Sequence, residues 1–265
     1  MRIELCRTVR FCLNPDGSLA WDAPATNTFA AWPPMRGLGR YYALHVACRG
    51  EADARTGYLL NIKHIDQAVR EAGLPRIAAA AREDGGAALG ELLRSIHTAL
   101  ARTLHCPVTR VGLQLAPTLC YTLLEVDMSR VLIAQQYDFS AAHRLHVPSL
   151  SPERNREIFG KCNNPSGHGH NYRLEVTVAA PIADDGSAID VELLDALVDR
   201  TIIDRFDHKH LNEDIDDFAG INPSVENIAR RCYQLLDDAV KQIDVELDQV
   251  RVWETDKTVA TYRGG

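Results

Sequence analysis

Residues 167–180 read GHGHNYRLEVTVAA and place two histidines at the start of a segment in which polar and apolar side chains alternate. Tyr172, Leu174 and Val176 occupy every second position, which is typical of a half-buried antiparallel strand. Side chains two residues apart point to the same face of a strand. We therefore expect His168 and His170 to face the same way, so that both imidazoles can bind one metal ion.

A second copy of this pattern lies in the first half of the chain and lacks the histidines. Residues 37–50 read GLGRYYALHVACRG, so both segments open with G-x-G-x-x-Y and continue with alternating apolar residues. Similar segments precede and follow each copy in the same order, at an offset of about 130 residues. The sequence thus predicts a tandem repeat, with one unit over residues 1–127 and the other over 128–265.

Each unit is predicted to contain two strands, two helices and two further strands, an arrangement of the α+β class. In the second unit we expect strands at 131–142 and 171–180 and a hairpin over 250–262. One helix should begin at Asp190, a favourable N-cap, and another at Asn222-Pro223, because proline is tolerated in the first helical turn. In the first unit we expect helices near 62–71 and 89–104, separated by a loop over 74–87.

Three histidines form the candidate metal site. His143 ends the strand before GHGHNY, and a hairpin would bring it alongside His168 and His170. Three neutral imidazoles suit Zn²⁺ and leave its fourth position open for water or substrate, as in catalytic zinc sites. His146 is an alternative third ligand that spacing alone does not distinguish from His143. An isolated H-x-H is more often a pair of solvated loop histidines, and the third histidine is what favours a metal.

Other residues with useful chemistry surround this site in the sequence, each with a simpler alternative. Cys162 precedes the histidine pair, and a thiolate near a dication has a lowered pKa that suits a general base, although a buried structural cysteine fits equally well. In Asp207-His208 the carboxylate can set the imidazole tautomer, but most such pairs are surface polar groups. Glu254 could bind two N–H groups of a heterocycle if it lies beside a pocket, and is otherwise an ordinary exposed strand residue.

Composition disfavours several classes of protein. A formal net charge of -7 over 265 residues argues against broad nucleic-acid binding, which needs a clustered basic surface. No run of eighteen apolar residues occurs and no apolar segment follows the first residues, so we expect neither a membrane span nor a secretory signal. The seven scattered cysteines include no C-x-x-C pair, which fits a reducing cytoplasm better than a disulfide framework.

Five spaced motifs in the second half resemble one enzyme family. The motifs are FSAAHRL (139–145), FGKCNNPSGHGHNY (159–172), FDHKHLN (206–212), NPSVENIA (222–229) and VWETD (252–256). Their order is that of the 6-pyruvoyltetrahydropterin synthase family, and the resemblance covers roughly 131–265. It implies the T-fold, in which each unit is a four-stranded antiparallel sheet with two helices on one face. Such units associate into barrels with active sites between neighbours, so a homo-oligomer is expected.

The resemblance also implies a role for each motif. It makes His143, His168 and His170 ligands of Zn²⁺, and Cys162 the general base. It makes Asp207 and His208 the partner pair for proton transfer. Glu254 would anchor the pterin ring, with Glu226 nearby, and Arg144 or Lys161 would meet the phosphates. The implied reaction is that of a carbon-oxygen lyase, which converts 7,8-dihydroneopterin triphosphate to 6-pyruvoyltetrahydropterin and releases triphosphate without a redox cofactor.

Two other functions remain open. The related 6-carboxytetrahydropterin synthases of queuosine (7-deazaguanine) biosynthesis use the same substrate and similar residues. Their loop between the cysteine and the first histidine is typically shorter than CNNPSGH (162–168), so the spacing favours the pyruvoyl product. The third possibility is a non-catalytic T-fold protein that binds a pterin or a metal, which the intact motifs of the second half disfavour.

The first unit lacks these residues. Aligned with the second unit, it has Pro15, Leu38 and Arg40 in place of the three histidines. The position of Glu254 falls on Gln114 or Leu115, depending on the register. We therefore expect a catalytically silent unit that contributes to assembly by covering strand edges.

Overall fold

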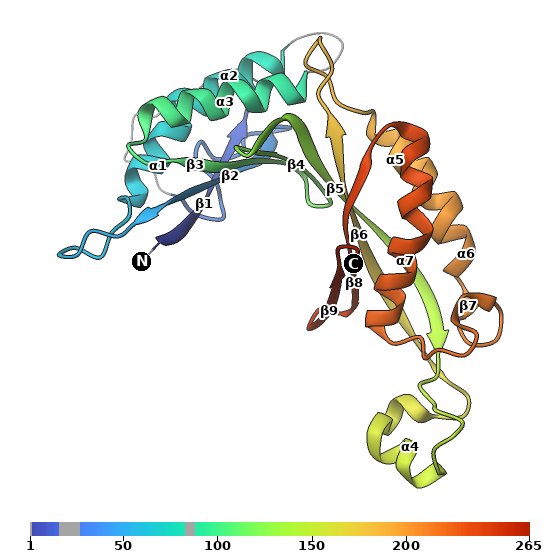
Figure 1. Ribbon diagram of the computed structural model, residues 1–265. Helices are drawn as coiled ribbons and strands as arrows, with labels where there is room; N and C mark the ends of the chain where they lie inside the picture. Colours follow the sequence, from blue (N-terminus) through green and yellow to red (C-terminus); the bar gives the residue numbers. More distant parts are fainter. Residues whose placement is uncertain (1, 16–26, 83–87) are drawn as a thin grey trace. The chain divides into compact units, whose positions relative to one another are not determined.

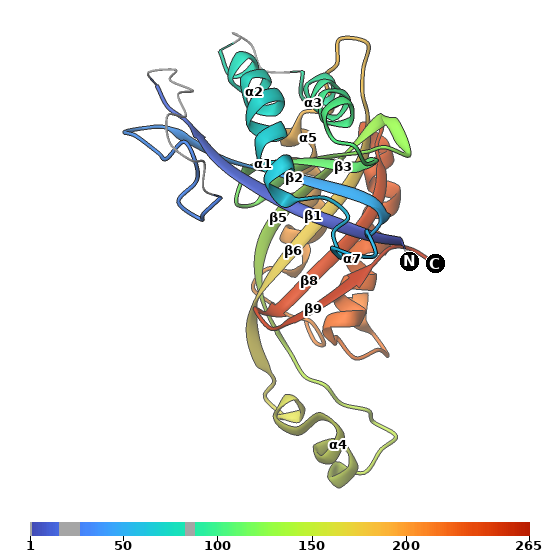
Figure 2. The same ribbon diagram turned by 90° about the vertical axis from the view of Figure 1, so that its left-hand side faces the viewer.

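The computed structural model describes residues 2–15, 27–82 and 88–265. The chain forms two compact units (Figures 1 and 2). The first comprises Met1–Ile133 and Ala180–Ala188, and the second comprises Ala134–Ala179 and Ile189–Gly265. Two long strands, β5 (Asp127–His143) and β6 (His168–Pro181), each have one end in the first unit and the remainder in the second.

The first unit contains an antiparallel sheet in the order β1-β2-β3-β4. Its strands are β1 (Arg2–Leu13), β2 (Arg40–Glu51), β3 (Val108–Ala116) and β4 (Leu119–Leu124). Its helices lie on one face of this sheet (Figure 1) and are α1 (Ile62–Ala68), a π-helical turn (Val69–Gly73), α2 (Leu74–Ala80) and α3 (Leu89–Thr103).

The second unit repeats this plan with the strand order β5-β6-β8-β9. Its last two strands are β8 (Glu246–Thr255) and β9 (Thr258–Tyr262), and the short β7 (Lys209–His210) pairs in parallel with β5. The main helices are α5 (Val191–Val198), α6 (Asp204–Phe206) and α7 (Val225–Ala239), with a π-helical turn (Asp199–Ile203) between the first two. Between β5 and β6 the chain forms α4 (Pro152–Phe159) and a 3-10 turn (Gly160–Asn163), beyond the ends of the strands (Figure 2). Two further 3-10 turns cover Asp216–Phe218 and Val240–Ile243.

The two units share details that composition alone does not require. Each has a π-helical turn at the same place, between α1 and α2 in the first unit and between α5 and α6 in the second. Phe11 pairs with Tyr42 across β1 and β2, with ring centroids 5.9 Å apart. Phe139 and Tyr172 stack in the second unit at 5.0 Å. The predicted α+β fold of tandem T-fold units is therefore confirmed.

The strand predictions are confirmed, and the helix boundaries need two corrections. The predicted loop over 74–87 is wrong in its first part, because Leu74–Ala80 is the helix α2. This helix follows the π-helical turn Val69–Gly73 directly, with Pro75 near its start, and Leu74 and Ile77 are buried. Residues 83–87 of that loop lie outside the described residues. In the second unit, Ser224 rather than Asn222 caps α7, since its hydroxyl accepts the Asn227 N–H.

Alternate side chains of each sheet form the core. In β6 the buried apolar positions are Tyr172, Leu174, Val176, Val178 and Ala180, which match the alternation in the sequence. The apolar side of α7 is buried through Ile228, Ala229, Cys232 and Leu236. None of the helices in the described part of the chain is both long and apolar enough to cross a bilayer.

Candidate metal centre and active site

The ends of two neighbouring strands hold the three histidines. His143 is the last residue of β5, and His168 and His170 are the first and third residues of β6. The strand begins three residues earlier than the sequence predicted, so both histidines are part of it. Gly167 precedes them with φ of 68°, a conformation that favours glycine. The turn into β6 therefore fixes where the histidine pair starts.

The structure brings the predicted ligands together. His143, His168 and His170 each have a ring nitrogen in the cluster, and these three nitrogens lie within 4.8 Å of one another. The Nε2 atoms of His143 and His168 are 3.1 Å apart. Two nitrogens bound to one tetrahedral zinc would be about 3.3 Å apart, given Zn–N bonds of about 2.0–2.1 Å. This spacing fits a shared metal ion.

A backbone carbonyl orients the most buried ligand. Nδ1 of His143 donates to the carbonyl oxygen of Pro223 at 2.6 Å, which leaves Nε2 unprotonated and directed toward the other two rings. Residue spacing does not predict this contact, because it joins residues 80 positions apart in the chain.

Burial favours the neutral forms of His143 and His168. Burial, together with repulsion from His168, His170 and His210, lowers the pKa of His143 to about 4, although the Pro223 hydrogen bond opposes the change. Burial and the neighbouring His170 also lower the pKa of His168. Nδ1 of His168 and Nε2 of His170 are buried without a hydrogen-bond partner. Neutral imidazoles with unpaired nitrogens are the donor set that a divalent transition metal requires.

Glu254 is next to the histidine cluster. Its Oε1 lies 3.5 Å from Nε2 of His143 and 3.8 Å from Nε2 of His170. Glu254 is on β8, and the pairing of Arg173 with Trp253 places it beside Tyr172 of β6. Glu254 is thus a half-buried strand residue beside the cluster rather than a fully exposed one.

Cys162 is half-buried in the 3-10 turn before β6. Its carbonyl accepts the N–H of Leu145, which ties this turn to the residues after β5. Burial and the nearby Glu254 carboxylate raise the pKa of the Cys162 thiol. A bound dication acts in the opposite direction, because it stabilises a thiolate.

Asp207 and His208 form a hydrogen-bonded pair beside the end of β5. The Asp207 carboxylate accepts the Ser140 N–H and the His208 Nδ1–H, both at 2.7 Å, and these bonds lower the pKa of Asp207. The His208 side chain is 83% exposed, so its Nε2 is accessible. His208 and His170 line the same cavity of about 490 Å³.

Glu226 and His146 lie outside the histidine cluster. Glu226 is exposed in the first turn of α7, and within the described residues no hydrogen bond or ion pair links it to the cluster. Nδ1 of His146 accepts a hydrogen bond from the Asn163 amide at 3.1 Å. It belongs to the neighbouring cavity rather than to the three-histidine group.

Comparison with known proteins explains this combination of residues. Residues 132–265, half of the chain, match the family described as 6-pyruvoyl tetrahydropterin synthase. The chain belongs to this family. The match covers all the histidines of the cluster, together with Cys162, Asp207 and Glu254.

Several members of the family are similar over the same region. The chain is 40% identical over 134 residues to the 6-pyruvoyl tetrahydrobiopterin synthase of Poecilia reticulata. The aligned region covers 50% of this chain and 89% of the relative. It is 33% identical over 133 residues to a putative 6-carboxy-5,6,7,8-tetrahydropterin synthase of Archaeoglobus fulgidus, covering 50% of this chain and 96% of the relative. The solved structure of Caenorhabditis elegans 6-pyruvoyl tetrahydropterin synthase is 34% identical, covers 51% of this chain and 96% of that chain, and has a TM-score of 0.48.

Residues 1–131 lie outside the matched region and lack the family's histidines. Because Phe11 and Tyr42 correspond to Phe139 and Tyr172, the ligand positions fall on Pro15, Leu38 and Arg40. The pairing of Ala43 with Gln114 puts Leu115 beside Tyr42, where the second unit has Glu254 beside Tyr172. The register thus favours Leu115 over Gln114 as the counterpart of Glu254.

Proposed function

We propose that this protein is a zinc-dependent 6-pyruvoyltetrahydropterin synthase. Its substrate is 7,8-dihydroneopterin triphosphate and its products are 6-pyruvoyltetrahydropterin and triphosphate. The observation that carries the proposal is the cluster of three histidines, whose ligand atoms lie within 4.8 Å of one another, in a member of this family. Zn²⁺ is the metal that fits best, because three imidazoles match its ligand preference and leave one coordination position open.

The ion and the protein have separate roles. When bound, Zn²⁺ supplies Lewis-acid chemistry that polarises the side-chain oxygens of the substrate. His143, His168 and His170 hold the ion, and Glu254 binds the 2-amino group and a ring N–H of the pterin. Bidentate pairing of this kind fixes the ring while the side chain reacts.

Proton transfer falls to Cys162 and to the Asp207–His208 pair. Cys162 takes a proton from the substrate side chain, and His208, with its tautomer set by Asp207, moves a proton at its exposed Nε2. The C–O bond to triphosphate breaks, and the hydrogen lost from the side chain appears on the ring. Substrate and protein therefore balance the reaction without an external reductant. Glu226 is a weaker candidate for pterin contact, since it is exposed at the start of α7.

A second candidate function is that of a 6-carboxytetrahydropterin synthase. It is supported by the 33% identity to the putative archaeal enzyme of that name. The longer CNNPSGH loop (162–168) favours the pyruvoyl product. Both functions share substrate, metal and leaving group, and differ in the carbon side chain of the pterin that is released.

For the first unit we propose a catalytically silent role in a cytoplasmic homo-oligomer, with residues 1–127 as the silent unit and 128–265 as the catalytic one. Its ligand positions hold proline, leucine and arginine, which cannot form the three-histidine site.

The seven free cysteines support the cytoplasmic location, because free thiols suit a reducing compartment. Size-exclusion chromatography with light scattering tests the oligomer.

The deciding experiment combines a product assay with metal analysis on the same sample. The protein is incubated with 7,8-dihydroneopterin triphosphate, and the pterin formed is identified by chromatography and mass spectrometry. We expect 6-pyruvoyltetrahydropterin, and we expect chelation to abolish its formation and added Zn²⁺ to restore it. Release of 6-carboxytetrahydropterin supports the second candidate. Zinc binding and pterin binding with no turnover contradict both enzymatic functions.

A further inference from the structure

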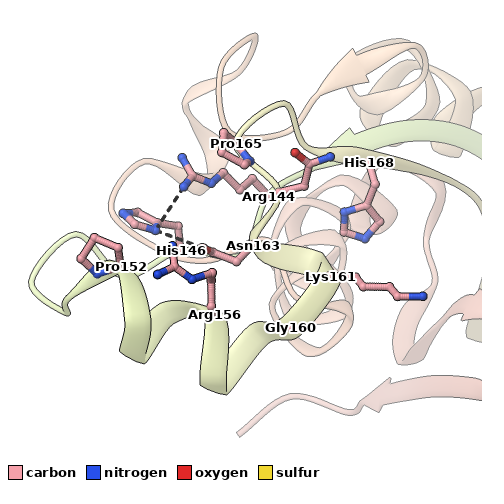
Figure 3. Close-up of a pocket in the computed structure, with 10 residues that line it drawn as sticks. Arg144, His146, Pro152, Arg156, Gly160, Lys161, Asn163, Pro165 and His168 are labelled. Carbon is pink, nitrogen blue, oxygen red and sulfur yellow. Dashed lines mark hydrogen bonds between the residues drawn. The ribbon is translucent and has the colours of Figure 1, made fainter.

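A second cavity borders the histidine cluster on the side of α4. Its volume is about 770 Å³, within the range of sites that hold small molecules. His168 lines this cavity and also belongs to the cluster, so the cavity opens directly beside the candidate metal ion. Figure 3 shows Arg144, His146 and Arg156 grouped on one side of it, with Lys161 and His168 on the other.

Positive charge dominates the lining. Three formal cations, Arg144, Arg156 and Lys161, contribute to it, and no aspartate or glutamate is among the lining residues described. The acidic group in contact is Glu153, which pairs with Arg156 at 2.9 Å where both side chains are largely exposed. An ion pair in that environment is weak and does not prevent Arg156 from binding another anion.

The protein holds these groups in place before any ligand is bound. The side-chain amide of Asn212 forms two hydrogen bonds with the backbone of Arg144. It accepts from the Arg144 N–H at 2.8 Å and donates to the Arg144 carbonyl at 3.0 Å. The Nε of Arg144 is buried without a hydrogen-bond partner. Because Nδ1 of His146 accepts from Asn163, the neutral His146 carries its hydrogen on Nε2 and offers another donor.

The alternative cavity, on the other side of the cluster, is less suited to an anion. Lys209 is the one lysine or arginine among its described lining residues. The others are small residues of β5 and β6, Asn171, and the histidines His170, His208 and His210. The Asp207 carboxylate is hydrogen-bonded to His208, which lines that cavity, and would repel a phosphate there.

We propose that the α4-side cavity binds the triphosphate of the substrate, with Arg156 of α4 acting beside Arg144 and Lys161. This inference rests on the proposed function, in which the triphosphate is joined to a three-carbon side chain held at the metal. The leaving group must therefore lie within a few bond lengths of the histidine cluster. Arginine guanidinium groups bind phosphate oxygens in pairs and stabilise the charge that the departing triphosphate gains.

Arg156→Gln tests the assignment, with Arg154→Gln as the matched control. Both arginines are on α4, but Arg154 pairs with Glu157 at 2.6 Å and does not line the cavity. Inorganic triphosphate and dephosphorylated 7,8-dihydroneopterin are titrated calorimetrically into the zinc-loaded protein. Zinc content is measured after each titration, because triphosphate chelates zinc.

We expect Arg156→Gln to weaken triphosphate binding by at least about tenfold, as loss of a charge-assisted hydrogen bond implies, and to raise KM for the pterin triphosphate. Dihydroneopterin binding should be unchanged, and Arg154→Gln should match the wild type. Equal triphosphate affinity in the two variants overturns the assignment even if turnover is normal. If triphosphate binding depends on Arg156 but the protein has no synthase activity, the anion site is supported and the proposed function is contradicted.

Discussion

At the scale of single residues, the GHGHNY motif combines two requirements that have different causes. Gly167 is needed for the backbone, because its φ is positive and a Cβ there would lie 2.6 Å from Nε2 of His210 and 3.0 Å from the His143 carbonyl. Gly169 has no such restriction, since the atom nearest to an added Cβ is 3.7 Å away. The two glycines therefore provide a matched pair.

Gly167→Ala should destabilise the protein and reduce its zinc affinity, whereas Gly169→Ala should be tolerated. A left-handed backbone costs an alanine about 1–2 kcal/mol, and the close contact with His210 adds to this cost. Urea unfolding of the metal-free proteins measures the first effect, and competition with a chromogenic chelator measures the second. Equal stability of the two variants would show that the turn into β6 does not depend on Gly167.

Cys162→Ala separates proton transfer from metal binding. General-base catalysis contributes about 10²–10⁴-fold, so we expect kcat to fall by at least about a hundredfold with zinc content unchanged. Stopped assays with the purified zinc-loaded variant measure the rate. Wild-type turnover in this variant would remove Cys162 from the mechanism.

At the scale of secondary structure elements, a buried carboxylate joins three segments of the second unit. Asp217, in the Asp216–Phe218 turn, accepts from Arg205 of α6 at 2.6 Å and from Arg231 of α7 at 2.9 Å. Its side chain is 1% exposed, whereas the two arginines are partly exposed. Burial opposes ionisation, but the two arginines outweigh it and hold the pKa of Asp217 below its usual value.

Asp217→Asn should lower the free energy of unfolding at pH 7 by about 2 kcal/mol. This is less than the 3–5 kcal/mol typical of a fully buried pair, because water screens the arginines. A depressed carboxylate pKa stabilises the fold above the unfolded value of about 3.9, and that contribution is lost as the pH falls through the folded pKa. The difference between wild type and variant should therefore be constant above about pH 5 and shrink below about pH 4. Urea titrations of both proteins in chelator, across this range, measure it; a pH-independent difference would contradict the ionic contribution.

At the scale of the whole molecule, the duplicated fold and the one histidine cluster found among the described residues predict the metal stoichiometry. We expect one zinc per 265-residue chain, and none in His168→Ala, which also loses activity while it retains the wild-type circular dichroism spectrum. Elemental analysis against protein concentration gives the ratio. Two zinc ions per chain, or one remaining in His168→Ala, would show a metal site that the three histidines do not explain.

Local patterns were enough to predict most elements of both units. The alternation in β6 and the 3.6-residue spacing in α7 come from the burial of one face, so they can be seen in the sequence. The helix α2 was missed because Pro75 and the nearby glycines resemble a loop, and the burial of Leu74 and Ile77 overrides that signal.

The sequence by itself predicted the repeat, the order of strands and helices in each unit and the metal-binding candidates, since these depend on residue type and spacing, and its resemblance to one family implied the T-fold. Tertiary structure decided which residues contact one another across the fold, which spacing along the chain does not determine. It selected His143 over His146, because one ends β5 inside the cluster and the other turns toward Asn163. It supplied the Pro223 carbonyl to His143 and brought Arg156 of α4 into the cavity beside His168. These contacts join residues distant in the chain, and only packing brings them together.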